Sequence, residues 1–477
     1  MFPRARVCWR HRSGKWHNGF GHEMAPHSHQ SGLLTDLYEL TMAAGYLATG
    51  FDARLTFELF VRSLPPRRNF LVAAGLDQAL EFLEDVRFSD EDIQYLRKLP
   101  VFKRLGADFF EYLAQFRFSG DVWAMREGTV FFPGEPILRV TGPAVEAQIV
   151  ETFLLSAIHF QTLIASKAAR MARAAGGRPL IEFGSRRAHG MEAGVLAARA
   201  AVIGGCQGTS NVAAGKQFGI PVYGTQAHSW IMAHEDEEEA FAKFLDIFPS
   251  EAVLLVDTYD VRAAVEKIIA MGRKPRGLRL DSGDITADSI WTRNRLNQAG
   301  WADVIVFASG DLDEERISEL LADGALVDGF GVGTALVNSS DSPTLGVIYK
   351  LVETEYEGEV RSVAKFSAAK ATYPGKKQVY RASDFRGRFV GDTIALADEK
   401  SSGAEPLLIP VMNQGKRIAP RTDLAEARRR CAEEIARLPE AVRGLEAEGD
   451  AYPVRHSERL ENMLKEVRRR LERAARI

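Results

Sequence analysis

Cysteine is nearly absent from this chain. Of 477 residues only three are cysteines, namely Cys8, Cys206 and Cys431. They lie far apart and form no CxxC pair, which argues against a disulfide framework and against a zinc site built from thiolates. A protein with so little cysteine suits a reducing compartment, so we expect it in the cytoplasm.

An excess of charge of one sign is also missing. The chain has 61 lysines and arginines against 64 aspartates and glutamates, a net charge of -3. Without a basic field we expect no nucleic-acid partner, and any polyanionic ligand must be held locally. No apolar run approaches the roughly 20 residues of a membrane helix, so we expect no membrane partner either. What remains is the composition of an ordinary soluble globular protein, 46% apolar and 26% charged.

The first 30 residues differ from the rest of the chain. They contain five of the ten histidines, four arginines, Lys15 and a single acid, Glu23. The histidines follow no spacing that favours a metal site, and no apolar central region indicates a signal peptide. We therefore predict a disordered tail over residues 1–30, within which Met24 is an alternative start.

Helical and strand-like patterns follow from Gly32 onward. Residues 33–50 and 74–86 predict helices from their apolar spacing, and residues 54–65 alternate as a strand does. Residues 120–143 carry short apolar runs between Gly and Pro residues, which favours small strands in a β-rich lobe. Residues 145–175 predict one long helix or two, with Lys167, Arg170 and Arg173 on the more polar side.

Seven short apolar runs then alternate with helical segments. The runs are PLIEF, GCQGTSN, IPVYGT, AVLLVD, GLRLD, DVIVFAS and VDGFGVGT. This rhythm is typical of a parallel α/β architecture, and right-handed crossovers close such units into a barrel or an open wound sheet. We favour a barrel because polar, chemically capable residues recur just after the runs. Residues 141–343 are therefore predicted to form an irregular parallel α/β barrel.

The pattern changes again after Pro343. Residues 346–396 alternate as strands do, with a turn at Glu357-Gly358. We predict that these strands return to the N-terminal lobe, so that residues 31–140 and 344–421 form one discontinuous α+β domain. Residues 422–477 predict C-terminal helices, whose arginine runs alternate with glutamates as on a solvated helix face.

Residues capable of chemistry cluster after the predicted strands. Asp281 and Asp284, with Gly283 between them, suit Mg²⁺ or the vicinal hydroxyls of a sugar, although they suit a turn and a helix cap equally well. The closely spaced glycines of GFGVGT let backbone amides approach a phosphate. His228 stands where a helix begins, but a lone histidine at a strand end is more often structural than catalytic.

Seven motifs that occur in one order favour a functional interpretation of these residues. They are LLTDLYELTM, EFGSRRAHG, GTSNVAAG, GTQAHSW, LRLDSGD, ASGDLDE and GFGVGT. Each is weak alone, but together and in this order they are highly specific. From about Leu34 to the C-terminal helices, the chain resembles the nicotinate phosphoribosyltransferases, of the dimeric type that also includes the nicotinamide enzymes.

The resemblance implies a role for each matching residue. His228, Arg279 and Asp281 would be catalytic, and His228 would be phosphorylated by ATP. Mg²⁺ would lie near Asp281 and Asp284. Tyr38 would stack on the pyridine ring from the neighbouring subunit of a homodimer, opposite Phe183. The substrate-binding set as a whole would be Tyr38, Phe183, Arg186, Ser210, Asp284, Gly310, Asp311, Gly331, Gly333 and Thr334.

Ser210 bears on which base is used. Relatives acting on nicotinamide place an aspartate after the Gly-Thr of the third motif, where this chain has Ser210. An aspartate would repel a carboxylate, and more strongly in a low-dielectric pocket than in water, whereas a serine can donate to it. Ser210 therefore favours nicotinate, unless it only caps the helix that starts near Val212.

The resemblance also implies a reaction. We expect nicotinate and phosphoribosyl pyrophosphate to give nicotinate mononucleotide and pyrophosphate, coupled to ATP hydrolysis, in the salvage of NAD. The alternatives are the same fold acting on nicotinamide and a non-catalytic metabolite-binding relative. The pyridine nitrogen has a free lone pair, so the reaction needs no general base. It needs stabilisation of charge on the ribose and on the departing pyrophosphate.

Overall fold

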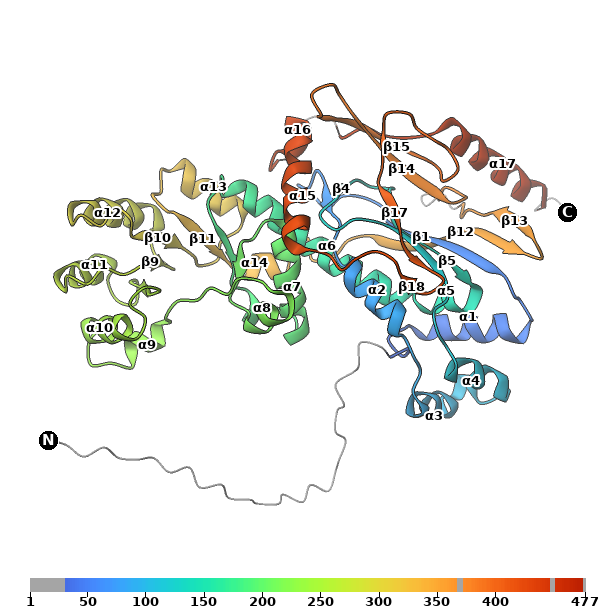
Figure 1. Ribbon diagram of the computed structural model, residues 1–477, viewed down its shortest axis with the longest axis horizontal. Coiled ribbons are helices and arrows are strands. Elements are labelled where there is room, and N and C mark those ends of the chain that lie inside the picture. Colours follow the sequence, from blue (N-terminus) through green and yellow to red (C-terminus); the bar gives the residue numbers. More distant parts are fainter. Residues whose placement is uncertain (1–30, 367–371, 447–450, 475–477) are drawn as a thin grey trace, which may run out of the picture.

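The protein is elongated, with a parallel α/β unit at one end and a largely antiparallel β lobe at the other (Figure 1). The computed structural model describes residues 31–366, 372–446 and 451–474, so the tail predicted over residues 1–30 lies outside the described residues. Two large apolar cores fill the two ends. Helix α6 (Glu151–Ala174) contributes to both, with Leu154 and Ile158 in the first core and Ala165 and Ala168 in the second.

The main sheet of the β lobe has seven strands, in the order β13-β12-β1-β5-β3-β17-β18. Their bounds are β1 Arg54–Val61, β3 Asp121–Met125, β5 Pro136–Pro143, β12 Val347–Tyr356, β13 Glu359–Ser362, β17 Leu408–Asn413 and β18 Lys416–Arg417. Strand β1 pairs with β5 on one side and β12 on the other, antiparallel to both. Strands from residues 54–143 therefore share one sheet with strands from residues 347–417.

A tight turn joins β12 to β13. Glu357 and Gly358 both have positive φ, 51° and 80°, and two such residues in a row suit the right-handed twist of a hairpin. The turn expected at Glu357-Gly358 is confirmed. This lobe also contains two smaller sheets. In the two-stranded sheet, β2 (Leu71–Val72) pairs with β4 (Val130–Phe131). The four-stranded sheet has the order β16 (Glu405–Pro406), β14 (Lys377–Ser383), β15 (Phe389–Leu396), β19 (Val454–His456).

Helices pack around these sheets and at the C-terminal end. Their bounds are α1 Leu37–Ala48, α2 Leu76–Asp85, α3 Asp90–Lys98, η1 Pro100–Phe102, α4 Ala107–Ala114, α5 Ala144–Ile149, α15 Leu424–Arg437, α16 Glu440–Arg443 and α17 Glu458–Ala474. Local chemistry fixes the start of α3. The side chain of Ser89 accepts from the Asp92 amide while the Asp92 carboxylate accepts from the Ser89 amide, a complete capping box.

The parallel sheet has six strands, in the order β7-β6-β11-β10-β9-β8. The strands are β6 (Leu180–Glu182), β7 (Gly208–Thr209), β8 (Val253–Leu255), β9 (Gly277–Leu280), β10 (Ile305–Ala308) and β11 (Gly329–Val332). The segments between them carry η2 (Ser185–Arg187), α7 (Met191–Gly204), α8 (Val212–Phe218), α9 (His228–Met232), α10 (Glu237–Ile247), α11 (Val261–Ala270), α12 (Ile285–Gln298) and α13 (Glu314–Ala322), and α14 (Thr334–Val337) follows β11. The predicted irregular α/β barrel is confirmed as a curled half-barrel.

One of the seven predicted strands is reduced to a single bridge. In IPVYGT only Val222 pairs, with Thr209 of β7, and no ladder joins it to β8 within the described part of the chain. Pro221 has no amide hydrogen to donate to a neighbouring strand, which explains why the ladder does not extend. The sheet is therefore open between Val222 and β8.

The polar side predicted for the helix of residues 145–175 is wrong for two of its three cations. Lys167 and Arg170 are only 2% and 5% exposed. Their charges are compensated by ion pairs to Glu314, and Lys167 also contacts Asp341. Arg173 is exposed as expected. Carboxylates that are distant in sequence therefore compensate the charges of these cations and allow them to be buried.

Helical residues Ala144–Ala174 are also long and apolar enough, by length and composition, to cross a membrane. This differs from the expectation that no run approaches that length. However, 61% of the most apolar window is buried inside the protein, as in the core helix of a globular fold.

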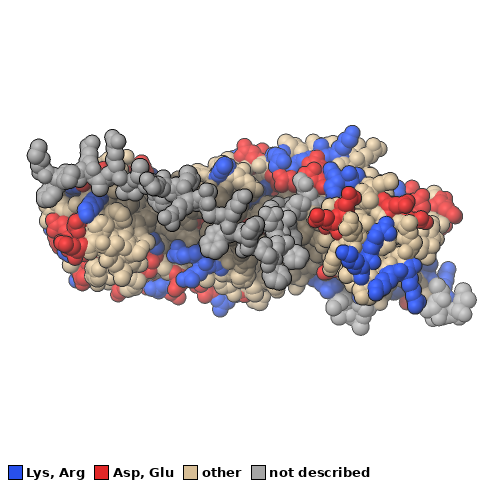
Figure 2. Space-filling view, turned by 90° about the horizontal axis from the view of Figure 1, so that it is seen from below, with Lys and Arg blue, Asp and Glu red and all other residues tan. Residues whose placement is uncertain are grey.

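On the face shown in Figure 2, Lys and Arg residues are interspersed with Asp and Glu residues.

Candidate active site

Arg279 connects three strand ends of the half-barrel. Its Nε donates to Ser309 Oγ at 2.7 Å, its Nη1 donates to Thr225 Oγ1 at 2.9 Å, and its Nη2 contacts Asp281 Oδ1 at 2.5 Å. Arg279 lies in β9, Ser309 follows β10, and Thr225 follows the Val222 bridge. The carboxyl ends of neighbouring parallel strands lie at one edge of the sheet, so residues distant in sequence meet there.

Ser309 stands at the centre of this cluster. Its buried hydroxyl accepts from Arg279 and donates to Asp281 Oδ1 at 2.5 Å. Burial would raise the pKa of Asp281, but the hydrogen bond from Ser309 and the charge of Arg279 hold that pKa below its ordinary value. Asp281 is therefore kept ionised, as a residue must be if it is to stabilise positive charge.

His228 is the first residue of α9, as expected, and its ring lies beside this cluster. Nδ1 is 3.2 Å from Thr258 Oγ1, and Nε2 is 3.8 Å from Asp281 Oδ2. The side chain is 42% exposed, so a ligand can reach it. The structure thus brings together all three residues expected to be catalytic, His228, Arg279 and Asp281.

Asp257 is a third carboxylate at this edge that the sequence analysis missed. Its Oδ2 accepts from the amide of Asp281 at 3.1 Å and from Ser282 Oγ at 2.5 Å. Its Oδ1 is buried and has no hydrogen-bond partner among the described residues. The signal was present in the sequence, because Asp257 and Thr258 directly follow the apolar run of β8, as Asp281 follows that of β9.

Asp284 lies in a different setting. Its Oδ1 accepts from the amide of Ala287 at 3.0 Å, so Asp284 caps α12. This is the helix-cap alternative that the sequence left open for Asp281 and Asp284. Within the described residues no group of three or more His, Cys, Asp or Glu side chains is placed to hold a metal ion. Any Mg²⁺ here would need ligands from a substrate as well.

The glycines of the next two motifs allow close approaches. Gly310 has φ 92°, and a Cβ there would collide with the carbonyl oxygen of Asp281, so only glycine lets β10 end beside β9. Gly331 lies within β11, where a Cβ would meet the ring of Phe183 at 2.6 Å. Gly331 therefore makes room for Phe183, whereas Gly333 and Thr334 begin the turn into α14. Asp311, next to Gly310, also has a positive φ of 46°.

Phe183 and Arg186 follow β6 on the other side of β11. The Arg279 guanidinium lies 5.8 Å from the centre of the Phe183 ring. Arg186 and Arg187 lie in η2, are exposed, and form no side-chain ion pair with another described residue. Two exposed, unpaired guanidinium groups are suited to a carboxylate or a phosphate.

Ser210 does not cap the following helix. The side chain of Asn211 does so, accepting from the amide of Ala214 at 3.0 Å. The backbone of Ser210 is fixed by its amide, which donates to the carbonyl of Glu182 at 2.9 Å. Its hydroxyl bonds to no other described residue, so it is available to a ligand. The capping alternative is therefore wrong.

Tyr38 is the residue that one chain does not bring to this site. It lies on α1, in the β lobe, and Figure 1 shows that lobe at the opposite end from β9 and β10. The side chain is 45% exposed on an outer surface with Leu37 and Met42. Burial and the neighbouring carboxylates of Glu151 and Glu39 raise the pKa of Tyr38, so it stays a neutral phenol.

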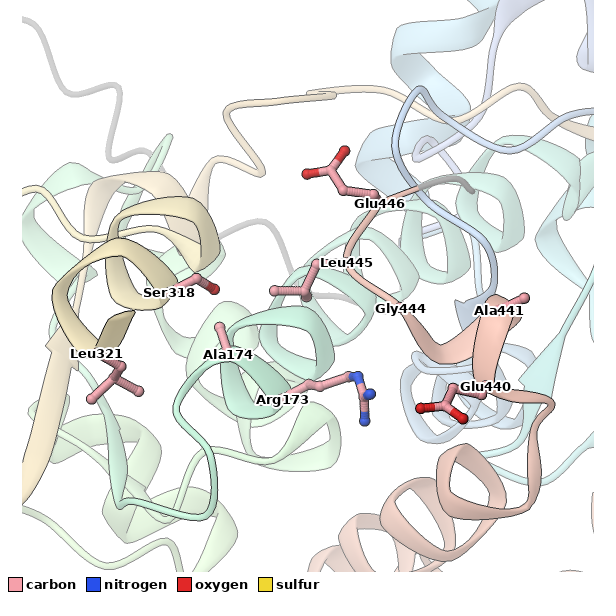
Figure 3. A pocket seen from close by; sticks show the side chains of 9 residues that line it. All are labelled: Arg173, Ala174, Ser318, Leu321, Glu440, Ala441, Gly444, Leu445 and Glu446. Atoms are coloured by element: carbon pink, nitrogen blue, oxygen red, sulfur yellow. The ribbon is translucent and has the colours of Figure 1, made fainter. Parts of the chain in front are cut away.

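Two pockets illustrate where ligands have room. One of about 530 Å³ lies inside the half-barrel and is lined by Phe183, Thr225 and Phe307, among others. Another of about 770 Å³ lies between α6, α13 and the α16 region and contains none of the expected site residues (Figure 3). Of these two cavities, the one inside the half-barrel shares Thr225 with the strand-end cluster.

Comparisons with known proteins agree over most of the chain. Three family models match in sequence order: the nicotinate phosphoribosyltransferase N-terminal domain over residues 33–159, the nicotinate phosphoribosyltransferase family over 179–394 and the corresponding C-terminal domain over 400–464. A nicotinate phosphoribosyltransferase of Mycobacterium tuberculosis is 46% identical, covering 93% of this chain and 96% of its own length. One of Bacillus subtilis is 45% identical, covering 77% and 76%. The crystal structure of human nicotinic acid phosphoribosyltransferase superposes with a TM-score of 0.80 at 29% identity, covering 91% of this chain and 99% of that one.

Proposed function

Because this chain belongs to the nicotinate phosphoribosyltransferase family, we propose that it transfers the phosphoribosyl group of phosphoribosyl pyrophosphate to nicotinate. The products are nicotinate mononucleotide and pyrophosphate, and the reaction serves the salvage of NAD. The observation that carries the proposal is the bridging of Thr225, Asp281 and Ser309 by Arg279, beside an accessible His228. The free, buried thiols of Cys206 and Cys431 support a reducing compartment, the cytoplasm.

The reaction exchanges one bond for another without moving a proton. The lone pair of the pyridine nitrogen forms a bond to the anomeric carbon, while the bond from that carbon to the pyrophosphate oxygen breaks and its electron pair leaves with pyrophosphate. The barrier is the separation of charge. We assign the ionised Asp281 to the developing positive charge on the ribose and Arg279 to the negative charge on the pyrophosphate.

The sugar and its 5′-phosphate are assigned to the loops that follow the last two strands. Gly310 and Asp311 would hold the ribose hydroxyls, and Gly333 and Thr334 would hold the phosphate through backbone amides. Phosphate sites of α/β barrels often lie at these strand ends. Gly331 contributes by making room for the Phe183 ring, against which the base would stack.

Mg²⁺ is proposed as the cofactor, held jointly by protein and substrate. One or two of the carboxylates of Asp257, Asp281 and Asp284 would supply hard oxygen donors of the kind this ion prefers, and the buried Oδ1 of Asp257 lacks a partner among the described residues. Mg²⁺ usually binds through one or two carboxylates together with substrate phosphates. When bound, it would neutralise charge on the pyrophosphate.

His228 is proposed to accept a phosphoryl group from ATP. A ring nitrogen would displace ADP from the γ-phosphorus, forming a phosphohistidine whose hydrolysis drives synthesis forward. The exposed ring, steadied by Thr258 and Asp281 on its two nitrogens, supports this role. A general base is not needed at this position, because the base nitrogen carries no proton to remove.

Nicotinate is favoured as the base by Ser210 and Arg186. The Ser210 hydroxyl, which is not used as a helix cap, can donate to a carboxylate, and the unpaired Arg186 guanidinium can bind one. Tyr38 is proposed to complete the site from the partner subunit of a homodimer, since α1 lies far from the strand ends of its own chain.

One assay tests the main proposal. The purified protein, with phosphoribosyl pyrophosphate and Mg²⁺, is offered nicotinate, nicotinamide or quinolinate, each with and without ATP. We expect nicotinate mononucleotide to form, faster with ATP. Turnover of nicotinamide but not nicotinate would overturn the argument from Ser210, and ligand binding without any turnover would indicate a metabolite-binding relative.

The His228→Ala variant tests the coupling separately. It should lose acid-labile labelling by γ-phosphate-labelled ATP and lose the stimulation by ATP, while retaining some ATP-independent transfer. Full stimulation in the variant would mean that another residue is the phosphate acceptor.

The shared site is tested by complementation. Tyr38→Ala and Arg279→Ala proteins are each expected to be inactive, but mixing them should restore activity through hybrid dimers that carry one intact site. If subunit exchange is demonstrated and no activity returns, each site belongs to one chain alone.

A further inference from the structure

We propose that Asn338 is a positioning residue, which ties the Arg186-Arg187 turn to the glycine loop so that phosphate binding in one place fixes the base-binding arginines in the other. The inference rests on the proposed function, in which Arg186 faces the base and Gly333 and Thr334 face the 5′-phosphate. None of the seven motifs contains Asn338, which lies four residues beyond the last of them.

The two segments are joined first through the backbone. Strand β6 pairs in parallel with β11, with Glu182 opposite Val332. The amide of Phe183 then donates to the carbonyl of Val332 at 2.7 Å, one residue beyond β6. The chain that carries the arginines and the chain that carries the glycine loop therefore leave the sheet side by side.

The segments are also packed together too tightly for a side chain to come between them. A Cβ at Gly184 would collide with the side chain of Val337 and would lie 2.9 Å from the carbonyl oxygen of Gly333. Gly184 comes directly before η2, and Val337 is the last residue of α14. The turn bearing the arginines thus rests on the one-turn helix that follows the glycine loop.

Asn338 supplies the third contact and the one made by a polar side chain. Its Nδ2 donates to the carbonyl oxygen of Arg187 at 3.2 Å. A carbonyl can only accept, so the amide nitrogen must be the atom that faces it. Inside the turn, the amides of Arg187 and Ala188 both donate to the carbonyl of Gly184. Asn338 therefore holds the carboxyl end of the turn from outside.

The arginines depend on this support because their side chains lack their own. Neither Arg186 nor Arg187 makes a side-chain ion pair or hydrogen bond with another described residue, and the chain beyond them, at His189 and Gly190, is exposed. Their placement is set by the backbone of the turn. A contact that fixes that backbone controls where two charges point.

The link to the phosphate follows from the length of α14. Gly333 is the residue before this helix and Asn338 the residue after it, with a single turn between them. A phosphate that orders Gly333 and Thr334 orders the same short turn that presents Asn338. Coupling between two ligands is reciprocal, so nicotinate should bind more tightly when the phosphate loop is filled, and the reverse.

The test compares nicotinate binding with and without ribose 5-phosphate, a probe for the glycine loop. Calorimetry on the wild-type protein should show tighter nicotinate binding when ribose 5-phosphate is saturating. In Asn338→Ala and Asn338→Asp this enhancement should fall about three- to tenfold, the effect of losing one hydrogen bond. Asn338→Asp keeps the size of the side chain but replaces the donor by an acceptor and adds a negative charge, whereas Asn338→Ala removes the donor without adding a charge. A loss that both variants share is therefore due to the hydrogen bond. The affinity for ribose 5-phosphate alone should change less than about twofold.

Ser340→Ala is the matched control, because Ser340 lies in the same loop, is exposed and makes no side-chain hydrogen bond to a described residue. It should behave as the wild type does. In kinetics, the KM for nicotinate should rise in the Asn338 variants with little change in kcat. An unchanged enhancement in both Asn338 variants, or an equal loss in Ser340→Ala, would overturn the proposal.

Tryptic cleavage after Arg187 gives a readout that does not depend on the base. Ribose 5-phosphate should slow cleavage there in the wild type and in Ser340→Ala, and should do so much less in Asn338→Asp. Equal protection in all three would refute the role of Asn338. A wild type that converts no nicotinate but shows Asn338-dependent protection would sink the proposed function and leave the positioning role standing.

Discussion

Replacing Ser309 by alanine removes a single oxygen atom from the centre of the candidate site, and two charged groups lose a partner with it. The Nε of Arg279 is left without the acceptor at 2.7 Å, and Asp281 loses the donor at 2.5 Å. Ser309 is 2% exposed, so water cannot readily take the place of the hydroxyl. The direct contact of Arg279 Nη2 with Asp281 remains and keeps the two residues near each other.

The size of the effect follows from these contacts. A hydrogen bond to a charged group is worth about 1.5–3 kcal/mol, and the remaining contact offsets part of a double loss. We expect Ser309→Ala to cost about 2–3 kcal/mol of transition-state stabilisation, a fall in kcat/KM of about 30- to 150-fold. Because the Ser309 hydrogen bond helps to lower the pKa of Asp281, that pKa should rise and the acid limb of the pH profile should move to higher pH.

The assay is steady-state formation of nicotinate mononucleotide between about pH 3.5 and pH 8, a range whose acid end includes the ordinary pKa of an aspartate, about 3.9. Ser289→Ala is the control, because Ser289 is equally buried and hydrogen-bonded, but on α12, to Thr286 and Leu326. It should lower stability and leave kcat/KM nearly unchanged. A folded Ser309→Ala protein with kcat/KM within about threefold of the wild type would refute the reasoning.

Three further predictions concern specificity, stability and pH. Ser210→Asp should lower kcat/KM for nicotinate by at least about tenfold through repulsion of its carboxylate, and raise the ratio of nicotinamide to nicotinate turnover, measured with both bases in competition. Lys167→Met should destabilise the fold by about 3 kcal/mol in urea unfolding, because Glu314 and Asp341 lose a buried cation; a change below about 1 kcal/mol would mean that their other partners suffice. Burial raises the pKa of Glu39 to about 7. The contribution of Glu39 to stability is complete below its ordinary pKa and is lost as pH rises through about 7. The melting temperature of Glu39→Gln, compared with that of the wild type, should therefore be higher at pH 8 than at pH 5. A difference in melting temperature that is the same at both pH values would contradict the raised pKa.

The sequence was most informative about residues that follow apolar runs. His228, Arg279 and Asp281 were expected at strand ends because short runs alternate with helical segments, and parallel strands bring such ends together. What could not be foreseen is which side chains touch across that edge. Ser309 and Thr225 are ordinary polar residues in the sequence, and only the order of the strands makes them partners of Arg279.

The errors came from contacts with distant residues. Helical spacing placed Lys167 on a polar side, but Glu314 and Asp341, more than a hundred residues away, draw it into the interior. The run at Val222 has the composition of a strand, yet it follows a proline that interrupts the ladder. The local sequence pattern indicates which structures a segment can form, whereas its tertiary contacts determine which of them it forms.

The opening of the half-barrel gives the segment that carries His228 a low local stability. Beyond the Val222 bridge, residues 223–227 belong to no ladder, and the Thr225 hydroxyl is tied to Arg279 by one hydrogen bond. Such a segment can open without disrupting the strands on either side, so its amides should exchange with solvent faster than those of β9 and β10. The proposed phosphate acceptor is thus attached to the segment that we expect to open first, while the groups proposed to bind the sugar follow strands held by full ladders.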